Sequence, residues 1–268
     1  MKAQKLFRAD KKQKVVDADA AMKPLSSGDK AQDKAHTEGL AQQIAALQNV
    51  FYADQSRKLL VVLQGMDTSG KDGTISGVFG KIDPLGIRSI PFKTPTAEER
   101  AHDFLWRIHR QVPAQGEIVI FNRSHYEDVL ITRVHRWIDE AECKRRYAHI
   151  CDFERMLAET GTVLLKFFLH LSKDEQKARL EERLADPDKH WKFDPQDLKE
   201  RELWTDYQQA YAETLTATDA DHAPWFVIPA DSKTQRNLAI ASITLEVLEG
   251  MKLAYPAAHP EYAKIKID

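Results

Sequence analysis

Residues 59–74, which read LLVVLQGMDTSGKDGT, decide the fold of this chain. The apolar run 59–63 is typical of a buried strand. Gly65, four further residues, Gly70 and Lys71 then match the GxxxxGK pattern of a phosphate-binding loop. Glycines permit backbone conformations in which successive N–H groups point at one anion, and a following helix directs its positive end at the same anion. The stretch therefore predicts a strand, a phosphate-binding loop and a helix.

Three side chains of this stretch indicate its chemistry. Lys71 supplies a mobile ammonium that can follow a phosphoryl group. Asp72 stands where Ser or Thr usually binds Mg²⁺, and Asp67 lies inside the loop; because these carboxylates would repel phosphate without a divalent cation between them, we interpret Asp67 as a metal-facing acid. The alternative is a glycine turn that binds nothing, but the flanking strand and helix favour the phosphate loop. The predicted phosphate-binding residues here are Gly65, Thr68, Ser69, Gly70, Lys71, Asp72, Gly73 and Thr74.

The composition is that of an ordinary globular protein. Its 268 residues are 43% hydrophobic and 30% charged, enough for a domain with a sizeable core. A net charge of −2 argues against a dedicated nucleic-acid binder, which normally has a basic excess. The spacing of Cys143 and Cys151 suits neither a metal pair nor an evident disulfide, so we expect reduced, buried thiols in a cytoplasmic protein. We find no apolar core for a signal peptide in residues 1–14, and no run approaches the roughly 20 apolar residues of a membrane span.

Alternating strand and helix patterns predict the fold class. Apolar runs predict strands at 59–63, 87–92, 117–121, 162–171 and 225–229. Periodic apolar positions and capping residues predict helices at 33–54, 74–81, 96–112, 139–160, 172–185, 198–216 and 232–255. This order predicts an α/β protein with a five-stranded parallel sheet covered by helices on both faces. We expect residues 1–30 to form an arm that is mobile or packs on a partner subunit, and residues 31–268 to form one domain.

The segment after the third predicted strand is rich in polar side chains. It reads NRSHYED at 122–128, and parallel sheets bind ligands beyond the carboxyl ends of their strands. Arg123 suits bidentate phosphate binding. Asn122 and Glu127 complete, with Asp67, a predicted set of metal-facing residues. The alternative is a solvated loop after a core strand.

Two further side chains near this segment are candidates for substrate contact. His125 lies within it and is the one histidine that we assign to a site. Arg133, one or two helical turns later, is the best candidate among many helical arginines for a wider anion channel. The alternative for each such arginine is a charge that simply faces water.

The connector between two predicted helices mixes basic and aromatic residues and predicts a lid around residues 183–198. Arg183, Lys189 and Lys192 could close on phosphates, because phosphoryl transfer must exclude water. Trp191 could stack on a base. The alternative is a surface helical hairpin.

Four stretches together make the chain resemble the family-2 polyphosphate kinases from about residue 35 to the C-terminus. They are GMDTSGKDGT at 65–74, FNRSHYED at 121–128, KHWKF at 189–193 and WFVIPA at 225–230. The resemblance implies a P-loop kinase fold similar to thymidylate kinase, a three-layer sandwich with a helical lid. It also accounts for Asp72, which belongs to that family's own loop.

The resemblance further implies roles for individual residues. Asp67 would be the metal-associated acid, Lys71 and Arg123 would hold the transferring phosphoryl group, and Glu127 would lie near the metal or the acceptor. Asn122, His125 and Trp191, from their places in the sequence, are the predicted nucleotide contacts. The implied polyphosphate path and lid residues are Arg133, Arg183, Lys189 and Lys192.

The implied reaction is Mg²⁺-dependent phosphoryl transfer between inorganic polyphosphate and nucleotides, with Mn²⁺ as an alternative metal. The sequence NRSHYE at 122–127 is similar to the subgroup that acts on both AMP and ADP, whereas other subgroups tend to carry DRSWYN. The alternatives are an ATP-dependent nucleotide kinase and a non-catalytic polyphosphate- or nucleotide-binding regulator. We expect a homo-oligomer, a dimer or a tetramer, with no nucleic-acid or membrane partner.

Overall fold

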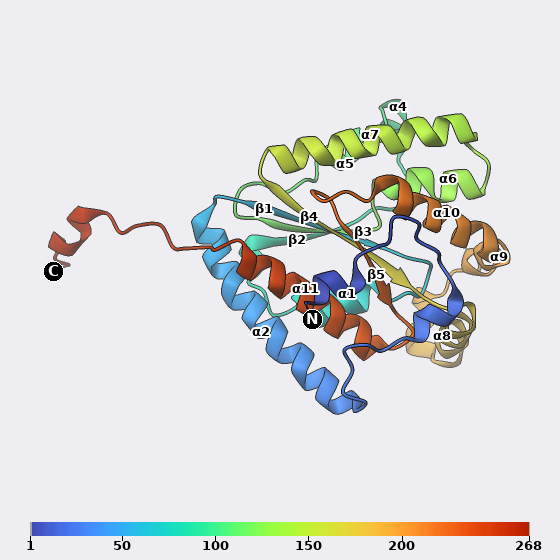
Figure 1. Ribbon diagram of the computed structural model, residues 1–268, viewed down its shortest axis with the longest axis horizontal. Coiled ribbons are helices and arrows are strands. Elements are labelled where there is room, and N and C mark those ends of the chain that lie inside the picture. Colours follow the sequence, from blue (N-terminus) through green and yellow to red (C-terminus); the bar gives the residue numbers. More distant parts are fainter. Residues whose placement is uncertain (1, 268) are drawn as a thin grey trace.

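The computed structural model describes residues 2–267 and has one five-stranded sheet at its centre (Figure 1). The strands are β1 (Lys58–Gln64), β2 (Ile87–Pro91), β3 (Ile118–Asn122), β4 (Thr162–His170) and β5 (Trp225–Pro229). Every neighbouring pair is parallel, in the order β2-β3-β1-β4-β5. The predicted five-stranded parallel sheet is therefore confirmed.

The position of β1 in the sheet places the phosphate loop at its centre. β1 lies between β3 and β4, with Leu60 opposite Val119 on one side and Leu164 on the other. After β1 the chain first forms β2 and β3 on one side of this strand and then β4 and β5 on the other side. The strand order therefore reverses at β1. Open parallel sheets bind ligands in the crevice at such a point.

Helices cover both faces of the sheet and make three layers. The long helices α2 (Lys30–Asp54) and α11 (Lys233–Gly250) cover one face, and α7 (Glu140–Glu159) and α10 (Trp204–Thr218) cover the other (Figure 1).

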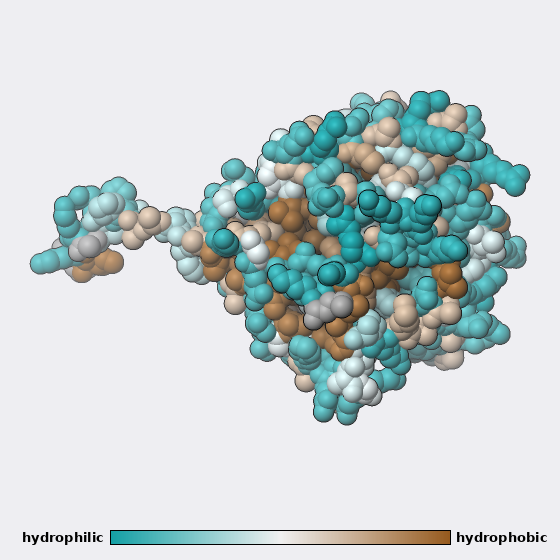
Figure 2. All heavy atoms as spheres, viewed as in Figure 1, coloured by the Kyte–Doolittle hydropathy of each residue, from teal (hydrophilic) through white to brown (hydrophobic). Residues whose placement is uncertain are grey.

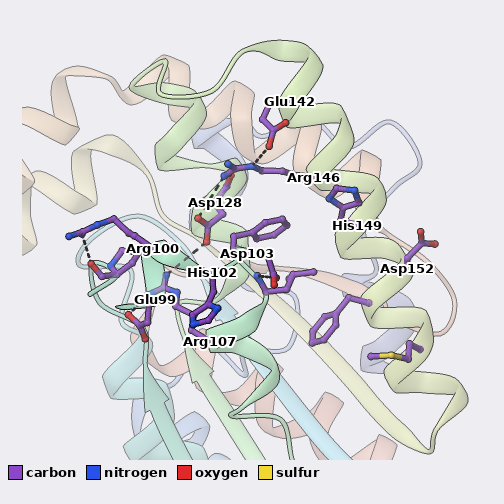
Figure 3. Close-up of a pocket in the computed structure, with 15 residues that line it drawn as sticks. Glu99, Arg100, His102, Asp103, Arg107, Asp128, Glu142, Arg146, His149 and Asp152 are labelled. Carbon is purple, nitrogen blue, oxygen red and sulfur yellow. Dashed lines mark hydrogen bonds and ion pairs between the residues drawn. The ribbon is translucent and has the colours of Figure 1, made fainter. Parts of the chain in front are cut away.

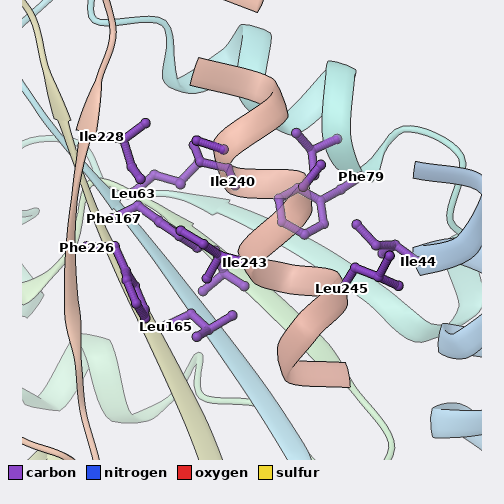
Figure 4. Close-up of a cluster of buried hydrophobic side chains, with 14 of the residues drawn as sticks. Ile44, Leu63, Phe79, Leu165, Phe167, Phe226, Ile228, Ile240, Ile243 and Leu245 are labelled. Carbon is purple, nitrogen blue, oxygen red and sulfur yellow. The ribbon is translucent and has the colours of Figure 1, made fainter. Parts of the chain in front are cut away.

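Alternate residues of each strand contribute to two separate cores. Leu63 joins the core under α11, where Ile240 and Ile243 pack toward the sheet (Figure 4), while Val62 joins the core under α7. This period of two is the pattern of a strand buried on both faces. Each fully buried aliphatic side chain contributes about 1.5–3 kcal/mol.

The remaining helices are shorter than α2, α7, α10 and α11. They are α1 (Ala3–Phe7), α3 (Lys71–Thr74), α4 (Ala97–Ala101), α5 (Trp106–His109), α6 (Ile131–Val134), α8 (Lys173–Ala185) and α9 (Gln196–Glu202). The 3-10 helices are Asp17–Ala21, Pro84–Gly86, His125–Val129, Pro187–Lys192 and Pro260–Lys264, and α3 continues as a π-helical turn, Ile75–Phe79.

Two predicted helices are interrupted, and a third is shorter than expected. The helix expected at 96–112 begins with the predicted capping box at Thr96, but it ends at Ala101 because His102 is extended; α5 starts afresh after Asp103. The helix expected at 198–216 is divided at Leu203 into α9 and α10. The helix expected at 232–255 ends at Gly250. In each case the apolar spacing continued across a backbone break that periodicity does not detect.

The N-terminal segment, residues 2–29, packs on its own chain. The backbone N–H of Ala9 donates to the Trp225 carbonyl (2.9 Å), which attaches the segment to the open edge of β5. The Asp17 carboxylate accepts hydrogen bonds from the Trp204 indole (3.2 Å) and the Lys173 backbone (3.1 Å). These contacts connect the segment to the start of α8 and α10.

Three further expectations concern the cysteines and the membrane. Cys143 and Cys151 are both free thiols; Cys143 is buried as expected, but Cys151 is partly exposed. Among the described residues, none of the helices has the length and apolar character needed to cross a membrane.

Candidate functional site

The phosphate loop, residues 65–70, has a tightly enclosed backbone. Gly65 and Gly70 have φ values of +154° and +98°, which favour glycine. A Cβ on Gly65 would lie 2.7 Å from the Leu169 carbonyl oxygen, and one on Gly70 would lie 1.8 Å from a guanidinium nitrogen of Arg236. Both positions therefore require glycine, and neighbouring groups fix the shape of the loop.

Lys71 lies against this loop with its side chain almost completely buried. Its Nζ donates to the carbonyl oxygens of Gly65 (2.8 Å) and Met66 (3.3 Å). Burial, together with the charge of Arg123, lowers the pKa of Lys71 to about 8 against the opposing charge of Asp67. Lys71 also lines the cleft at the ends of the strands, so a phosphoryl oxygen there could replace one of these carbonyl oxygens as acceptor of the ammonium.

Two arginines that the sequence analysis did not assign to the site donate hydrogen bonds to carbonyl oxygens of the phosphate loop. Arg179 of α8 donates to the carbonyl oxygens of Thr68 (2.9 Å) and Ala230 (2.7 Å). Arg236 of α11 donates to the Ser69 carbonyl (3.1 Å), and burial, with the charge of Arg179, lowers its pKa to about 10. Both helices begin directly after a strand, which is a signal that the sequence analysis used only after β1 and β3, but only the fold shows which arginine of each helix contacts the loop.

The segment after β3 places Arg123 next to Asp67 of the phosphate loop. Arg123 has a φ of +64° and forms an ion pair with Asp67 and a longer one with Glu127 (3.5 Å). The charges of Glu127 and Asp67 raise the pKa of Arg123 above its ordinary value. The Asn122 amide donates to Asp72 (2.7 Å). The residues predicted to be catalytic therefore lie together at the end of the sheet.

A cleft of about 580 Å³ opens beyond the strand ends and extends to residues 183–198, the segment predicted to be a lid. Nine basic side chains line it: Lys71, Lys93, Arg123, Arg179, Arg183, Lys189, Lys192, Lys233 and Arg236. Five acidic side chains accompany them: Asp67, Asp72, Glu182, Asp194 and Asp197. Lys93 follows β2 and was missed for the same reason as the two arginines. The basic excess suits a polyanion, although the whole chain is slightly acidic.

Two of the three cations predicted for the lid, Arg183 and Lys189, are paired with carboxylates and remain partly exposed. Lys189 contacts Glu182 (2.8 Å) and Asp186 (3.0 Å), and Arg183 contacts Asp197 (3.6 Å). The predicted base-stacking residue, Trp191, is 79% exposed, and its ring lies under the ammonium of Lys192 (4.8 Å).

The acidic side chains of the cleft offer few but suitable ligands for a divalent cation. No group of three or more His, Cys, Asp or Glu side chains within residues 2–267 is placed to hold a metal. Burial and the charge of Asp67 raise the pKa of Asp197 to about 7, and both carboxylates line the cleft. Mg²⁺ usually takes one or two carboxylates and completes its shell with phosphate and water. This donor set fits such an ion.

A second cavity, of about 820 Å³, lies between the segment after β2 and helix α7 (Figure 3). Arg107 connects it to the cleft, because its Nη1 donates to the carbonyl of Lys93 (2.8 Å). Phe104 lies in its wall, with the Arg146 guanidinium 5.2 Å from the ring centre. The cavity thus combines an aromatic face with cations that point inward.

Asp128 lies at the inner end of this second cavity between Arg107 and Arg146 (Figure 3). Burial raises the pKa of Asp128 to about 6, against the opposing charges of the two arginines. Its Oδ2 is buried and has no hydrogen-bond partner. An acceptor atom in this position can receive a hydrogen bond from a ligand.

Three predicted site residues point away from the cleft. His125 has no exposed surface and contacts Glu154 (3.3 Å) inside the protein, so the assignment of a nucleotide contact is corrected. Arg133 forms an ion pair with Glu213 of α10, on the wall of a different pocket, so it does not line the anion cleft. Thr74 is buried and its hydroxyl lies 3.5 Å from the Asn237 amide oxygen of α11, so it does not face a phosphate. Position in the sequence predicted the correct loop and helix for each but not the direction of its side chain.

Comparisons with known proteins agree with this geometry. The family described as Polyphosphate kinase 2 (PPK2) matches residues 27–256. An AMP/ADP-polyphosphate phosphotransferase of Meiothermus ruber is 51% identical over 85% of this chain and 85% of its own. An ADP-polyphosphate phosphotransferase of Rhodopseudomonas palustris is 41% identical over 83% and 81%. The crystal structure of polyphosphate kinase 2 from Arthrobacter aurescens TC1 matches with a TM-score of 0.95 and 44% identity, over 98% of this chain and 95% of that one.

Proposed function

The chain belongs to the polyphosphate kinase 2 family, and on this premise we propose that it transfers phosphoryl groups between inorganic polyphosphate and nucleotides, making ADP from AMP and ATP from ADP. The observation that carries the proposal is the cleft at the strand ends, where nine basic side chains, the buried Lys71 among them, lie beside the phosphate loop. A polyanion with about one charge per phosphate is the ligand for which such a cleft is suited.

Positioning and charge neutralisation would supply most of the catalysis. Lys71 and Arg123 hold the transferring phosphoryl group, and Arg179 and Arg236 keep the loop carbonyls in place behind it. The acceptor oxygen of a nucleotide phosphate is ionised at neutral pH, so no strong general base is required. The loose transition state of phosphoryl transfer spreads its charge over oxygens that these cations face.

We propose Mg²⁺, with Mn²⁺ as an alternative, as the metal of this site. Asp67 and Asp197 are the carboxylates that would hold it, and Asn122 and Glu127 remain the other predicted ligands. A bound divalent ion would neutralise phosphate charge that the lysines and arginines leave uncompensated. Asp67 would have to exchange part of its contact with Arg123 for the metal.

We further propose that the second cavity receives the nucleoside of the acceptor, with the base against Phe104 and the α-phosphate toward Arg107 and the cleft. The aromatic face, the inward cations and the free acceptor of Asp128 support this assignment. Phe104→Ala is then expected to raise the KM for AMP about 10-fold and to leave the KM for polyphosphate within about 2-fold, since a base–aromatic contact contributes about 1–3 kcal/mol. Trp137→Ala, an exposed aromatic outside both cavities, is the control.

One assay tests the proposed function. The purified protein is incubated with AMP, polyphosphate and Mg²⁺, and ADP and ATP are followed separately. We expect ADP first and ATP afterwards, and no product after chelation of the metal. Transfer from ATP but not from polyphosphate would favour the ATP-dependent nucleotide kinase, while tight polyphosphate binding without turnover would favour the regulator.

The remaining proposals concern partners and location. We propose a homo-oligomer, a dimer or a tetramer, since apolar side chains gather over α11 beside α1 and α2 (Figure 2) and Leu6 and Met22 are exposed. Light scattering coupled to size exclusion measures the mass. The free thiols support a cytoplasmic location, and the net charge supports the absence of a nucleic-acid partner.

A further inference from the structure

A buried charged cluster lies beneath the segment that carries Arg123, and the mechanism above does not use it. Glu154 of α7 and Lys166 of β4 are at most 1% exposed, and Nζ of Lys166 lies 2.6 Å from Oε2 of Glu154. Tyr126 and His125, both with no exposed surface, complete the cluster. The two charges are thus fully enclosed in the core between the sheet and α7.

Every hydrogen of the Lys166 ammonium has an acceptor. Besides Glu154, Nζ donates to the Tyr126 hydroxyl (2.9 Å) and to the Thr218 carbonyl at the end of α10 (2.8 Å). Oε1 of Glu154 accepts from the Tyr126 hydroxyl (2.7 Å) and lies 3.3 Å from Nε2 of His125. Burial alone would raise the pKa of Glu154, but the charge of Lys166 and these bonds hold it below its ordinary value. The donors of Lys166 are all satisfied, while Nδ1 of His125 is buried without a partner, and the bonds between Lys166, Glu154 and Tyr126 allow these three side chains one geometry.

Stability alone is a weak reason for such a cluster. The cost of removing two charges from water usually cancels their attraction, and well-packed apolar replacements of similar size are often neutral or stabilising. Apolar neighbours are available, because Trp225 and the Tyr126 ring lie 5.0 and 5.3 Å from Nζ. The buried pair is therefore better explained by the arrangement of side chains that it imposes than by the free energy that it adds to folding.

The arrangement of the buried cluster determines the position of Tyr126, which lies next in the chain to Glu127 and close to Arg123. Tyr126 directly precedes Glu127, and its backbone N–H donates to the Ser124 hydroxyl (3.2 Å). Arg123 adopts a φ of +64°, a conformation that costs a non-glycine residue about 1–3 kcal/mol and persists only when its surroundings enforce it. The Leu63 carbonyl fixes one end of this turn by accepting from the Arg123 N–H (3.1 Å). The buried cluster fixes the other end.

We propose that Glu154 and Lys166 are positioning residues that hold Arg123 and Glu127 in register with the phosphate loop. They act through Tyr126 and do not touch substrate. The inference rests on the proposed phosphoryl transfer, since it assigns their effect to the step in which Arg123 binds the phosphoryl group.

The first test replaces both charges by apolar side chains, Glu154→Leu with Lys166→Met. We expect a folded protein whose kcat falls about 10- to 100-fold, as for a displacement of about 1 Å, with both KM values within about 3-fold. The control is Arg88→Met with Glu117→Leu, which removes an ion pair at the amino end of the same sheet and should leave kcat unchanged. A double variant with the parent kcat would overturn the proposal.

A second test separates positioning from general destabilisation and needs only mild variants. Glu154→Gln, Arg123→Lys and their combination form a double-mutant cycle. If Glu154 acts through Arg123, Glu154→Gln slows the parent about 10-fold but slows the Arg123→Lys protein by less than about 2-fold. Fully multiplicative effects on kcat would refute the positioning role while leaving the proposed function intact. If the parent itself transfers nothing from polyphosphate, the proposed function is what fails.

Discussion

The phosphate loop and the lid both present cations to the cleft, but they hold them in different ways. Lys71, Arg179 and Arg236 are buried and donate to backbone carbonyls of the loop. Lys189 and Arg183 pair with carboxylates of the lid and its flanking helices. Backbone acceptors fix a cation in place, whereas a carboxylate partner can be exchanged for a phosphate. If the cleft binds phosphates as proposed, the comparison predicts a preformed loop and a predicted lid, residues 183–198, whose charges rearrange on binding.

The largest expected effect tests the buried side of this comparison. Lys71→Ala should lower kcat by at least about 10³-fold, because it removes a cation from a water-poor site where it faces the transferring group. Thermal unfolding should show an intact fold. Lys81→Ala, which removes an exposed lysine paired with Glu38, should retain the parent rate. Near-parent turnover of Lys71→Ala would disprove the site assignment.

A smaller effect is expected from the arginine behind the loop. Arg179→Met leaves the carbonyls of Thr68 and Ala230 buried without this donor, so the free energy of unfolding should fall by about 2–4 kcal/mol. We expect kcat to fall about 10- to 100-fold as the loop loosens. Chemical denaturation and initial rates measure the two effects. Arg155→Met, at an exposed position of α7, should change neither.

The pH dependence distinguishes the buried lysine from the exposed ones. In the proposed mechanism the charged form of Lys71 binds phosphate; because its pKa is lowered to about 8, raising the pH above 8 removes the proton and with it the attraction. We expect kcat/KM for polyphosphate to fall about 10-fold per pH unit above that value. In Lys71→Arg the side chain stays charged, so this alkaline decline should disappear. A decline that persists in Lys71→Arg would show that another group titrates.

The smallest effect belongs to the lid. Lys189→Gln and Lys192→Gln should each raise the KM for polyphosphate about 3- to 10-fold and reduce the slope of log KM against log salt by somewhat less than one. Lys177→Gln, a similarly exposed lysine of α8 that does not line the cleft, is the control. Losses as large as that of Lys71→Ala would remove the distinction between the two regions.

The sequence predicted the parts of the fold that depend on local pattern. The strand before Gly65 and the parallel sheet followed from apolar runs, and the glycine spacing located the loop. The division at His102 was not predictable, because apolar spacing continues through a break that one extended residue makes.

The candidate site was predicted less completely, for a different physical reason. Asp67, Lys71 and Arg123 were found because a motif or a strand end identifies them. Arg179 stands in mid-helix, where its sequence resembles that of any solvated arginine, and only the fold shows that it contacts the loop. His125 is the opposite case: Asn122 and Arg123 line the cleft, but the turn that follows them buries His125 in the core.

The contact between Ala9 and Trp225 has a consequence for how the molecule behaves at high concentration. A parallel sheet has two open edges, and each exposes peptide groups that can pair with another chain. Here the N-terminal segment covers part of the β5 edge, and Pro91, which has no N–H, ends the β2 edge. The segment therefore blocks intermolecular strand pairing at this part of β5. A shortened chain that begins after Ala9 would leave the β5 edge open and is expected to aggregate.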